Sequence, residues 1–230
     1  MATFILVPGA GGVAWYWHRV VQLLEEAEHV AIAVDLPGND EQAGLSVYAD
    51  RVVEAIGTRR VVLVAQSLGG FTAPLVCEQV AVRMLVLVNA MIPVPGETAG
   101  EWWDNTGAVA ARRAAAHRGG YSTNVDLATY FVHDVPPEII KQGEAHQRSE
   151  ADIVFGEPCH FEAWPKIPIR VIAGRDDRFF PIEFQRRVAR ERLNVAIDEL
   201  PGGHLIALSN PRGLIHQLLN YQSELAWNSH

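Results

Sequence analysis

The chain has 230 residues, of which 49% are hydrophobic and 20% charged, a composition typical of one globular domain that can carry a sizeable insertion. Its net charge of −8 argues against a nucleic-acid partner, because binding to phosphates relies on an excess of lysine and arginine. Cys77 and Cys159 have neither the spacing of a zinc site nor that of a disulfide framework, so we expect free thiols and no bound metal.

The first residues, Met1-Ala2-Thr3, supply no basic segment before the apolar run Phe4–Val7, although a signal peptide would require one. No stretch of the chain approaches the roughly 18 apolar residues of a membrane-spanning helix. We therefore expect a cytoplasmic protein with no membrane partner.

Short apolar runs, followed by glycine or proline, recur along the chain and predict β-strands. They are Phe4–Val7, Val30–Val34, Val61–Ala65, Met84–Val88, Ile169–Ala173 and Asn194–Leu200. Most are apolar throughout, which is typical of strands buried on both faces of a parallel sheet. Helical patterns alternate with them, at Trp15–Glu28, Ser46–Ile56, Gly69–Val80, Ile182–Arg192 and Pro211–Ala226. This alternation predicts an α/β fold with a doubly wound, mostly parallel sheet of about six strands.

The interval from residue 93 to residue 166 interrupts this alternation. It has no strand pattern, contains an Ala/Arg-rich helical stretch at Val109–Arg118, and has prolines clustered at both ends. Because a structureless loop of this length is uncommon in a compact domain, we predict a helical cap inserted after the fourth strand. The core would then comprise residues 1–92 and 167–230.

The third strand ends in Val64-Ala65-Gln66-Ser67-Leu68-Gly69-Gly70, and a helical pattern follows at once. A serine between small residues at a strand-to-helix turn is the nucleophile-elbow arrangement, G-x-S-x-G, here with Ala65 in place of the first glycine. The pattern predicts that Ser67 is a nucleophile whose hydroxyl projects above the strand ends.

A nucleophilic serine needs a general base, and the base needs a carboxylate to orient it. Of the nine histidines, only His204 lies in a glycine-rich turn after a predicted strand. Asp176 and Asp177 follow the fifth predicted strand, at the same edge of the sheet. The order Ser67, Asp177, His204 is that of the α/β hydrolases, with Asp176 as the alternative acid.

The tetrahedral oxyanion of acyl transfer needs hydrogen-bond donors. The Leu68 N–H, directly after the nucleophile, is the first, and the second is expected from the glycine-rich loop 8–12. The same loop offers a rival interpretation as a dinucleotide fingerprint, with Gly9, Gly11 and Ala14 in the motif and Asp35 as the ribose ligand. That interpretation leaves the other motifs of the chain unexplained.

Taken together, these residues resemble the α/β-hydrolase superfamily, and within it the branch of plant methyl esterases and hydroxynitrile lyases with related small bacterial esterases. The resemblance rests on Val7-Pro8-Gly9-Ala10, Ala14-Trp15-Tyr16-Trp17, Asp35-Leu36-Pro37-Gly38, Gln66 to Gly70, Asp177 to Pro181, Glu183-Phe184-Gln185 and Gly203-His204. It implies that the Ala10 N–H is the second oxyanion donor, although Pro8 stands where the branch normally has histidine.

The resemblance also separates ester hydrolysis from cyanohydrin cleavage. The lyases of this branch carry threonine after the first-loop histidine and lysine directly after the catalytic histidine, whereas this chain has Gly9 and Leu205 at those places. Without that cation, released cyanide lacks a stabilising charge, so the resemblance favours hydrolysis.

The superfamily places its cap where the interval 93–166 lies. Its aromatic residues Trp102, Trp103, Phe131 and Trp164 are expected to line an apolar substrate pocket, or else to form a small core of the cap itself.

The sequence therefore predicts a serine hydrolase, free of cofactor and metal, that cleaves a small, largely apolar carboxylic ester or lactone through an acyl-enzyme. The alternatives are a C–C bond hydrolase or lyase that uses the same triad, and a ligand-binding protein on the same fold with little turnover.

Overall fold

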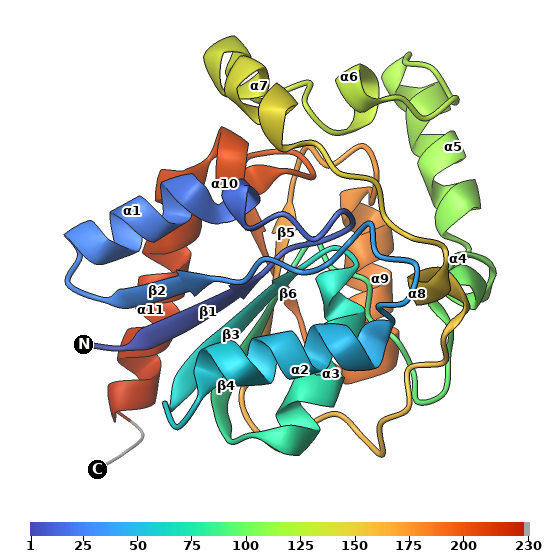
Figure 1. Cartoon of the computed structure of the whole chain (residues 1–230). Helices are drawn as coiled ribbons and strands as arrows, with labels where there is room; N and C mark the ends of the chain where they lie inside the picture. Colours follow the sequence, from blue (N-terminus) through green and yellow to red (C-terminus); the bar gives the residue numbers. More distant parts are fainter. Residues whose placement is uncertain (228–230) are drawn as a thin grey trace.

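The computed structural model of the chain describes residues 1–227 and shows a sheet of six parallel strands. The strands are β1 (Thr3–Val7), β2 (Val30–Ala33), β3 (Val61–Gln66), β4 (Val82–Val88), β5 (Ile169–Gly174) and β6 (Ile197–Leu200). Their order is β2-β1-β3-β4-β5-β6, so β1 and β3 lie side by side near the middle (Figure 1). The predicted α/β fold with a parallel sheet is confirmed.

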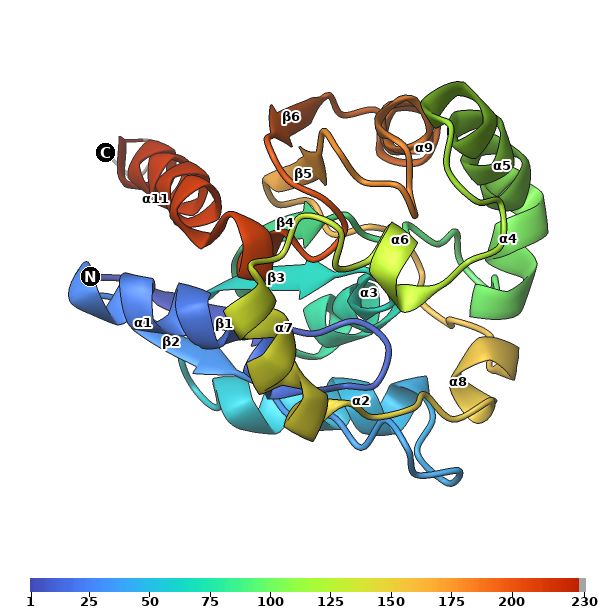
Figure 2. The same cartoon turned by 90° about the horizontal axis from the view of Figure 1, so that it is seen from above.

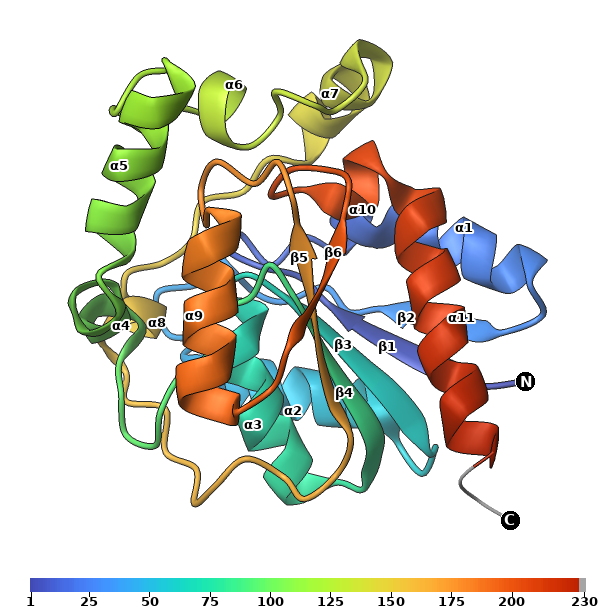
Figure 3. The ribbon, with the colours of Figure 1, turned by 180° about the vertical axis from the view of Figure 1, so that it is seen from behind.

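Helices cover both faces of the sheet, because successive side chains of each buried strand point to opposite sides. The helices η1 (Ala14–Trp17), α1 (His18–Glu26), α10 (Ile206–Ser209) and α11 (Pro211–Trp227) lie on one face, and α2 (Leu45–Ile56), α3 (Gly69–Gln79) and α9 (Ile182–Leu193) lie on the other (Figure 3). In β1, for example, Phe4 and Leu6 pack toward α1 and α11, whereas Ile5 and Val7 pack toward α2 and α3. None of the helices in the described part of the chain is both long and apolar enough to cross a bilayer.

The stretch between β4 and β5, called the β4–β5 segment here, is helical. It contains α4 (Ala99–Thr106), α5 (Ala108–Gly119), α6 (Leu127–Tyr130), α7 (Pro137–Gly143), η2 (Glu144–His146) and α8 (Ile153–Gly156). Helices α6 and α7 lie over the edge of the sheet where the strands end, as the side view and the view from above both show (Figures 1 and 2).

The buried side chains of this segment join the two hydrophobic clusters of the sheet. Trp102 and Val154 pack with the cluster beneath α2, α3 and α9, whereas Val135 and Ile139 pack with the cluster beneath α1 and α11. The segment is thereby fixed to both faces of the core, which places α7 above the end of β3.

Two predicted element boundaries were wrong for identifiable reasons. The predicted helix Trp15–Glu28 begins with a tighter 3-10 turn, Ala14–Trp17, before α1 continues from His18. The last predicted strand, Asn194–Leu200, starts only at Ile197, because Asn194 takes a left-handed conformation (φ 55°) and ends α9.

Candidate active site

The turn between β3 and α3 holds Ser67 in a strained conformation. Its φ of 51° lies in the left-handed region that residues other than glycine rarely occupy. The Ser67 N–H donates to the Val88 carbonyl at 3.3 Å, and its own carbonyl accepts from the Met91 N–H at 2.9 Å. An ideal Cβ on Gly69 would lie 2.7 Å from the Pro8 carbonyl oxygen, so this position requires glycine. The sharp turn carries the Ser67 hydroxyl above the strand ends.

His204 lies between Ser67 and Asp177. Its Nε2 is 3.0 Å from Ser67 Oγ, and its Nδ1 is 2.9 Å from Asp177 Oδ2. Because an ionised carboxylate only accepts hydrogen bonds, Nδ1 carries the proton and Nε2 is left to accept from the serine hydroxyl. The structure thus brings together the three side chains that the sequence singled out.

The two aspartates after β5 differ in what they bind. Asp177 is buried, and its Oδ1 accepts from the N–H groups of Phe179 and Phe180, both at 2.8 Å, while Oδ2 faces His204. Asp176 instead accepts from the Gly202 N–H at 3.1 Å and so holds the turn that precedes the histidine. The carboxylate that contacts His204 is therefore that of Asp177 and not that of Asp176, a choice that the sequence left open.

Three phenylalanine rings surround the imidazole. Phe131, Phe179 and Phe180 meet His204 edge to face, with ring centroids 5.5, 5.0 and 5.1 Å away. Because these rings exclude water from the buried His204–Asp177 pair, they strengthen the electrostatic interaction between the two side chains.

Asn89, at the end of β4, joins the two turns that carry His204 and Asp177. Its Nδ2 donates to the carbonyls of Gly203 and His204, both at 3.0 Å, and its Oδ1 accepts from the Gly174 N–H at 2.7 Å. The Gln185 amide donates to Asn89 Oδ1 and also to Asp177 Oδ2, at 3.3 and 3.2 Å. Asn89 was not predicted from the sequence, although a polar residue directly after an apolar strand could have indicated it.

The two predicted oxyanion donors belong to segments that lie next to Ser67. The Leu68 N–H follows it directly, and loop 8–12 approaches so closely that an ideal Cβ on Gly9 would lie 2.8 Å from Ser67 Cβ. Within the described residues, neither the Leu68 nor the Ala10 N–H donates to a protein acceptor, so both can donate to a bound group. The Asp35 carboxylate of the rival dinucleotide interpretation accepts from the Ala14 N–H and pairs with Arg148.

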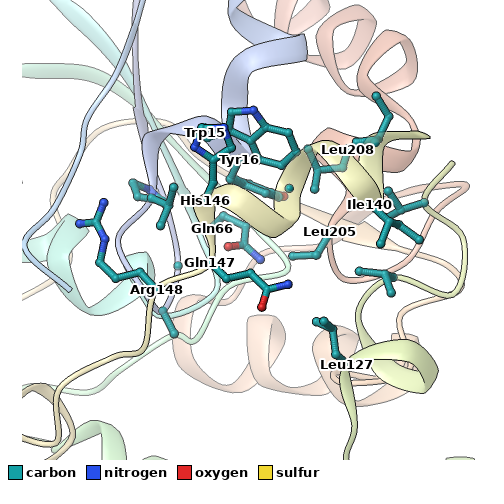
Figure 4. A pocket seen from close by; sticks show the side chains of 18 residues that line it. Trp15, Tyr16, Gln66, Leu127, Ile140, His146, Gln147, Arg148, Leu205 and Leu208 are labelled. Carbon is teal, nitrogen blue, oxygen red and sulfur yellow. The ribbon is translucent and has the colours of Figure 1, made fainter. Parts of the chain in front are cut away.

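A cavity of about 340 Å³ opens beside this loop, between the sheet and α7 (Figure 4). Gly9 and Ala10 line it from the loop, and Gln66 and Leu205 adjoin Ser67 and His204 in the chain. Most of its other walls are apolar, contributed by Val13, Trp15, Tyr16, Leu127, Val132, Val135, Ile139, Ile140 and Leu208. The cavity therefore adjoins the segments that carry Ser67 and His204, and its walls are suited to an apolar group.

The aromatic residues predicted to line the pocket lie elsewhere. Trp102 is fully buried, its indole N–H donates to the Ile92 carbonyl at 3.1 Å, and it packs against Phe180 and Phe184 under α9. Trp103 packs on Phe179, and Trp164 packs on Phe161 and donates to the Pro93 carbonyl. The expectation that they line the cavity is corrected, because α4 packs against the α9 side of the sheet and the cavity forms beneath α7.

Phe131 is the member of that predicted set that reaches the site, where it borders His204 and not the cavity wall. Among the residues that line the cavity are Trp15 and Tyr16 of η1, which the sequence indicated only as part of the family resemblance, and Ile139 and Ile140 of α7, which were not predicted. The apolar pair Ile139-Ile140, which follows Pro136 and Pro137, could have indicated a helix start with a buried face at this point of the sequence.

The sequence of the chain was compared with those of known proteins and protein families. The sequence profile of the alpha/beta hydrolase family matches residues 4–217. The "Alpha-hydroxynitrile lyase" of Arabidopsis thaliana is 24% identical over 94% of this chain and 95% of its own length. The "Probable esterase PIR7A" of Oryza sativa subsp. indica is 34% identical over 42% of each chain.

Solved structures show the same fold. A polyneuridine aldehyde esterase superimposes with a TM-score of 0.79 at 21% identity, over 96% of this chain and 99% of its own. A pyrethroid hydrolase from Sphingobium faniae JZ-2 gives a TM-score of 0.78 at 22% identity, over 96% of both chains. The branch that the sequence resembles is confirmed by these relatives, and the chain belongs to the alpha/beta hydrolase family.

Proposed function

We propose that the protein is a serine hydrolase that cleaves a carboxylic ester with Ser67 as nucleophile, His204 as general base and acid, and Asp177 as the carboxylate that orients His204. The observation that carries this proposal is the continuous hydrogen-bonded chain from Ser67 Oγ through His204 to Asp177 Oδ2. The chain's membership of the alpha/beta hydrolase family and its esterase-named relatives support it.

The reaction has two halves. His204 Nε2 takes the Ser67 proton as Oγ attacks the ester carbonyl, and the N–H groups of Leu68 and Ala10 hold the negative oxygen. The intermediate collapses when His204 returns the proton to the departing alkoxide, which leaves an acyl group on Ser67. Water, deprotonated by His204, then attacks the acyl carbon and releases the acid, and the proton returns to Ser67.

We propose a small, largely apolar ester or lactone as substrate. The cavity of about 340 Å³ lies near the lower end of the range of about 300–1,000 Å³ that small-molecule sites span. Its apolar walls favour an alkyl or aryl group, because burying such a group is favourable in proportion to its apolar area.

Cyanohydrin cleavage is the second candidate, because the Arabidopsis relative matched over nearly its full length is named a hydroxynitrile lyase. Against it stands Leu205, an apolar side chain that lines the cavity directly after His204, where released cyanide would need a cation. An assay for cyanide release from mandelonitrile decides between the two, and cyanide formation faster than ester turnover would favour the lyase.

The proposal is tested by labelling with a fluorophosphonate and by turnover of a panel of p-nitrophenyl esters. We expect the wild type to be labelled and to turn over short apolar esters, and Ser67→Ala to lose both. Ser46→Ala, which changes an exposed serine of α2, is the matched control and should keep both. A folded wild type that neither takes the label nor hydrolyses any ester would overturn the proposed function.

A further inference from the structure

A short stretch of the β4–β5 segment, residues 147–151, crosses the outside of the loops that follow β1 and β2; we call it the strap. The Ala151 N–H donates to the Gly38 carbonyl at 2.7 Å. The Arg148 guanidinium donates to the Leu36 carbonyl and pairs with Asp35 at 2.9 Å. The strap is therefore anchored to the loop after β2 at both of its ends.

Glu150, the half-buried residue near the end of the strap, uses both carboxylate oxygens on the core. Its Oε2 accepts from the Gly11 N–H, and its Oε1 accepts from the Tyr48 hydroxyl on α2. Tyr48 is buried, so this partner is fixed by the packing of α2 on the sheet. Burial raises the pKa of Glu150, while hydrogen bonds from Tyr48 and Gly11 and the charge of Arg148 oppose that rise.

Gly11 belongs to the loop that carries the proposed oxyanion donor. Its φ is +85°, and an ideal Cβ there would lie 2.5 Å from the Arg148 carbonyl oxygen, so the loop and the strap are in direct contact. The turn is closed by the Gly12 N–H, which donates to the Gly9 carbonyl at 3.0 Å.

The Gly11 N–H lies in the peptide unit directly after Ala10. Glu150 fixes the plane of that unit, and the turn from Gly9 to Gly12 fixes the unit before it, which carries the Ala10 N–H. The Ala10 N–H lies in the plane of the unit before Ala10, and the two units are joined at the Ala10 Cα. By holding the Gly11 unit, the Glu150 carboxylate therefore restrains the turn that carries the Ala10 N–H.

We propose that Glu150 is a positioning residue that, from the β4–β5 segment, holds the Ala10 N–H in place for the oxyanion. This inference rests on the proposed function and deepens it, since it makes contact with the strap a condition for a complete oxyanion site. Glu150 acts through the shape of its two hydrogen bonds, because a negative charge one peptide unit from Ala10 does not itself stabilise an oxyanion.

Two substitutions distinguish the effect of the two Glu150 hydrogen bonds from the effect of its negative charge. Glu150→Gln removes the charge but keeps both bonds, since its carbonyl can accept from Gly11 and its amide can donate to the Tyr48 oxygen. Glu150→Asp keeps the charge but is one methylene too short to reach both partners. Glu150→Ala removes both bonds, and Glu144→Ala, at an exposed residue of η2, is the control.

The four variants are compared by kcat and KM on one ester and by the affinity of a trifluoromethyl ketone, whose adduct with Ser67 places an oxyanion in the site. We expect Glu150→Asp and Glu150→Ala to lower kcat by about 10- to 100-fold with KM changed less than about threefold. The affinity for the ketone should fall by the same factor as kcat. Glu150→Gln should stay within about threefold of wild type on every measure, and Glu144→Ala should be unchanged.

The inference is overturned if Glu150→Asp retains kcat, if Glu150→Gln loses as much as Glu150→Asp, or if kcat falls while the ketone binds as before. Should Glu150→Ala not fold, the comparison of Gln with Asp still decides. Fluorophosphonate labelling of Ser67 in the wild type distinguishes failure of this inference from failure of the proposed function. If labelling is present and the variants behave alike, the role of Glu150 is wrong and the proposed function stands.

Discussion

Among individual residues, the adjacent pair Asp176 and Asp177 gives the sharpest contrast. Asp177 Oδ2 faces the His204 N–H, whereas Asp176 Oδ2 accepts from the backbone of Gly202. Asp177→Asn should lower kcat by about 10³- to 10⁴-fold, because an amide in that place lets the imidazole hold its proton on the wrong nitrogen. Asp176→Asn should stay within about threefold, since an amide oxygen still accepts from Gly202.

Steady-state hydrolysis of a p-nitrophenyl ester by both variants makes this comparison, with circular dichroism to show that each is folded. If Asp176→Asn were the slower enzyme, the role of the carboxylate would pass to Asp176.

Two asparagines with positive φ make a second matched pair. Asn89 (φ 45°) is fully buried and binds the carbonyls of Gly203 and His204 as well as the Gly174 N–H, whereas Asn194 (φ 55°) is exposed at the end of α9. Glycine tolerates both backbone conformations, so substitution by glycine isolates the side chain. Asn89→Gly should lower the free energy of unfolding by about 2–4 kcal/mol, because it leaves buried polar groups without partners.

Asn194→Gly should change the free energy of unfolding by less than about 0.5 kcal/mol, because glycine is the usual residue at such a helix end. Urea unfolding of both variants measures the difference. Equal losses in the two would mean that the Asn89 side chain contributes little to holding the His204 and Asp177 turns.

Between elements, a buried ion pair ties the start of the β4–β5 segment to α9. Arg192 donates to Glu97 with both terminal nitrogens, Asn105 donates to Glu97 at 2.8 Å, and the Glu97 side chain is only 2% exposed. Burial alone would raise the pKa of Glu97, but the hydrogen bonds from Arg192 and Asn105 outweigh it and lower the pKa below its usual value of 4.5.

A lowered carboxyl pKa contributes stability that is fully present above pH 4.5 and is lost as the pH falls through the lowered value. Glu97→Gln should therefore cost about 2–3 kcal/mol at pH 7, because it leaves the Arg192 guanidinium unpaired, and the difference from wild type should shrink as the pH falls below 4.5. Urea unfolding at neutral and acid pH measures this dependence. Glu191→Gln, in the exposed pair with Arg187, should cost less than about 0.5 kcal/mol. A gap between Glu97→Gln and wild type that widens in acid would contradict the assignment.

The elements that the sequence predicts best are those with a periodic apolar pattern and a clear stop signal. The β3 run ends at Gln66, directly before Ser67 and its glycines. The α11 helix begins at Pro211, directly after Asn210, whose side chain accepts from the Gly213 N–H. That Ser67, Asp177 and His204 lie together followed from chain order, because parallel strands end at one edge of the sheet. The position of α7 did not follow, since a short helix in a long segment is placed by tertiary contacts such as that of Ile139 with the core cluster. The same reasoning applies to Trp102, which was expected in the pocket. A sequence can indicate that such a side chain is buried, but it does not indicate which face of the sheet the side chain packs against.

For the molecule as a whole, the β4–β5 segment helps to enclose the cavity, because α7 contributes Ile139 and Ile140 to its walls and η1 contributes Trp15 and Tyr16 (Figure 4). The depth of the cavity then sets the largest group that an ester can place there. Ile140, a cavity-lining residue of α7, offers a way to shorten it without touching Ser67 or His204. In Ile140→Trp, kcat/KM for an acetate ester should stay within about threefold of wild type, whereas kcat/KM for a hexanoate ester should fall by about tenfold or more. The reason is that each methylene that no longer fits the pocket costs about 1–3 kcal/mol of binding in the transition state.

Val125→Trp, at an exposed position that does not line the cavity, controls for the added indole and should affect neither ester. The same comparison is then made with acetate esters of short and long alcohols. If Ile140→Trp slows the long acyl chain, the acyl half of the ester enters the cavity, and if it slows the long alcohol, the alcohol half does. If Ile140→Trp slowed neither series, the cavity beneath α7 would not be where the substrate lies. A binding site on the far side of Ser67, toward Phe131 and Phe179, would then have to take its place.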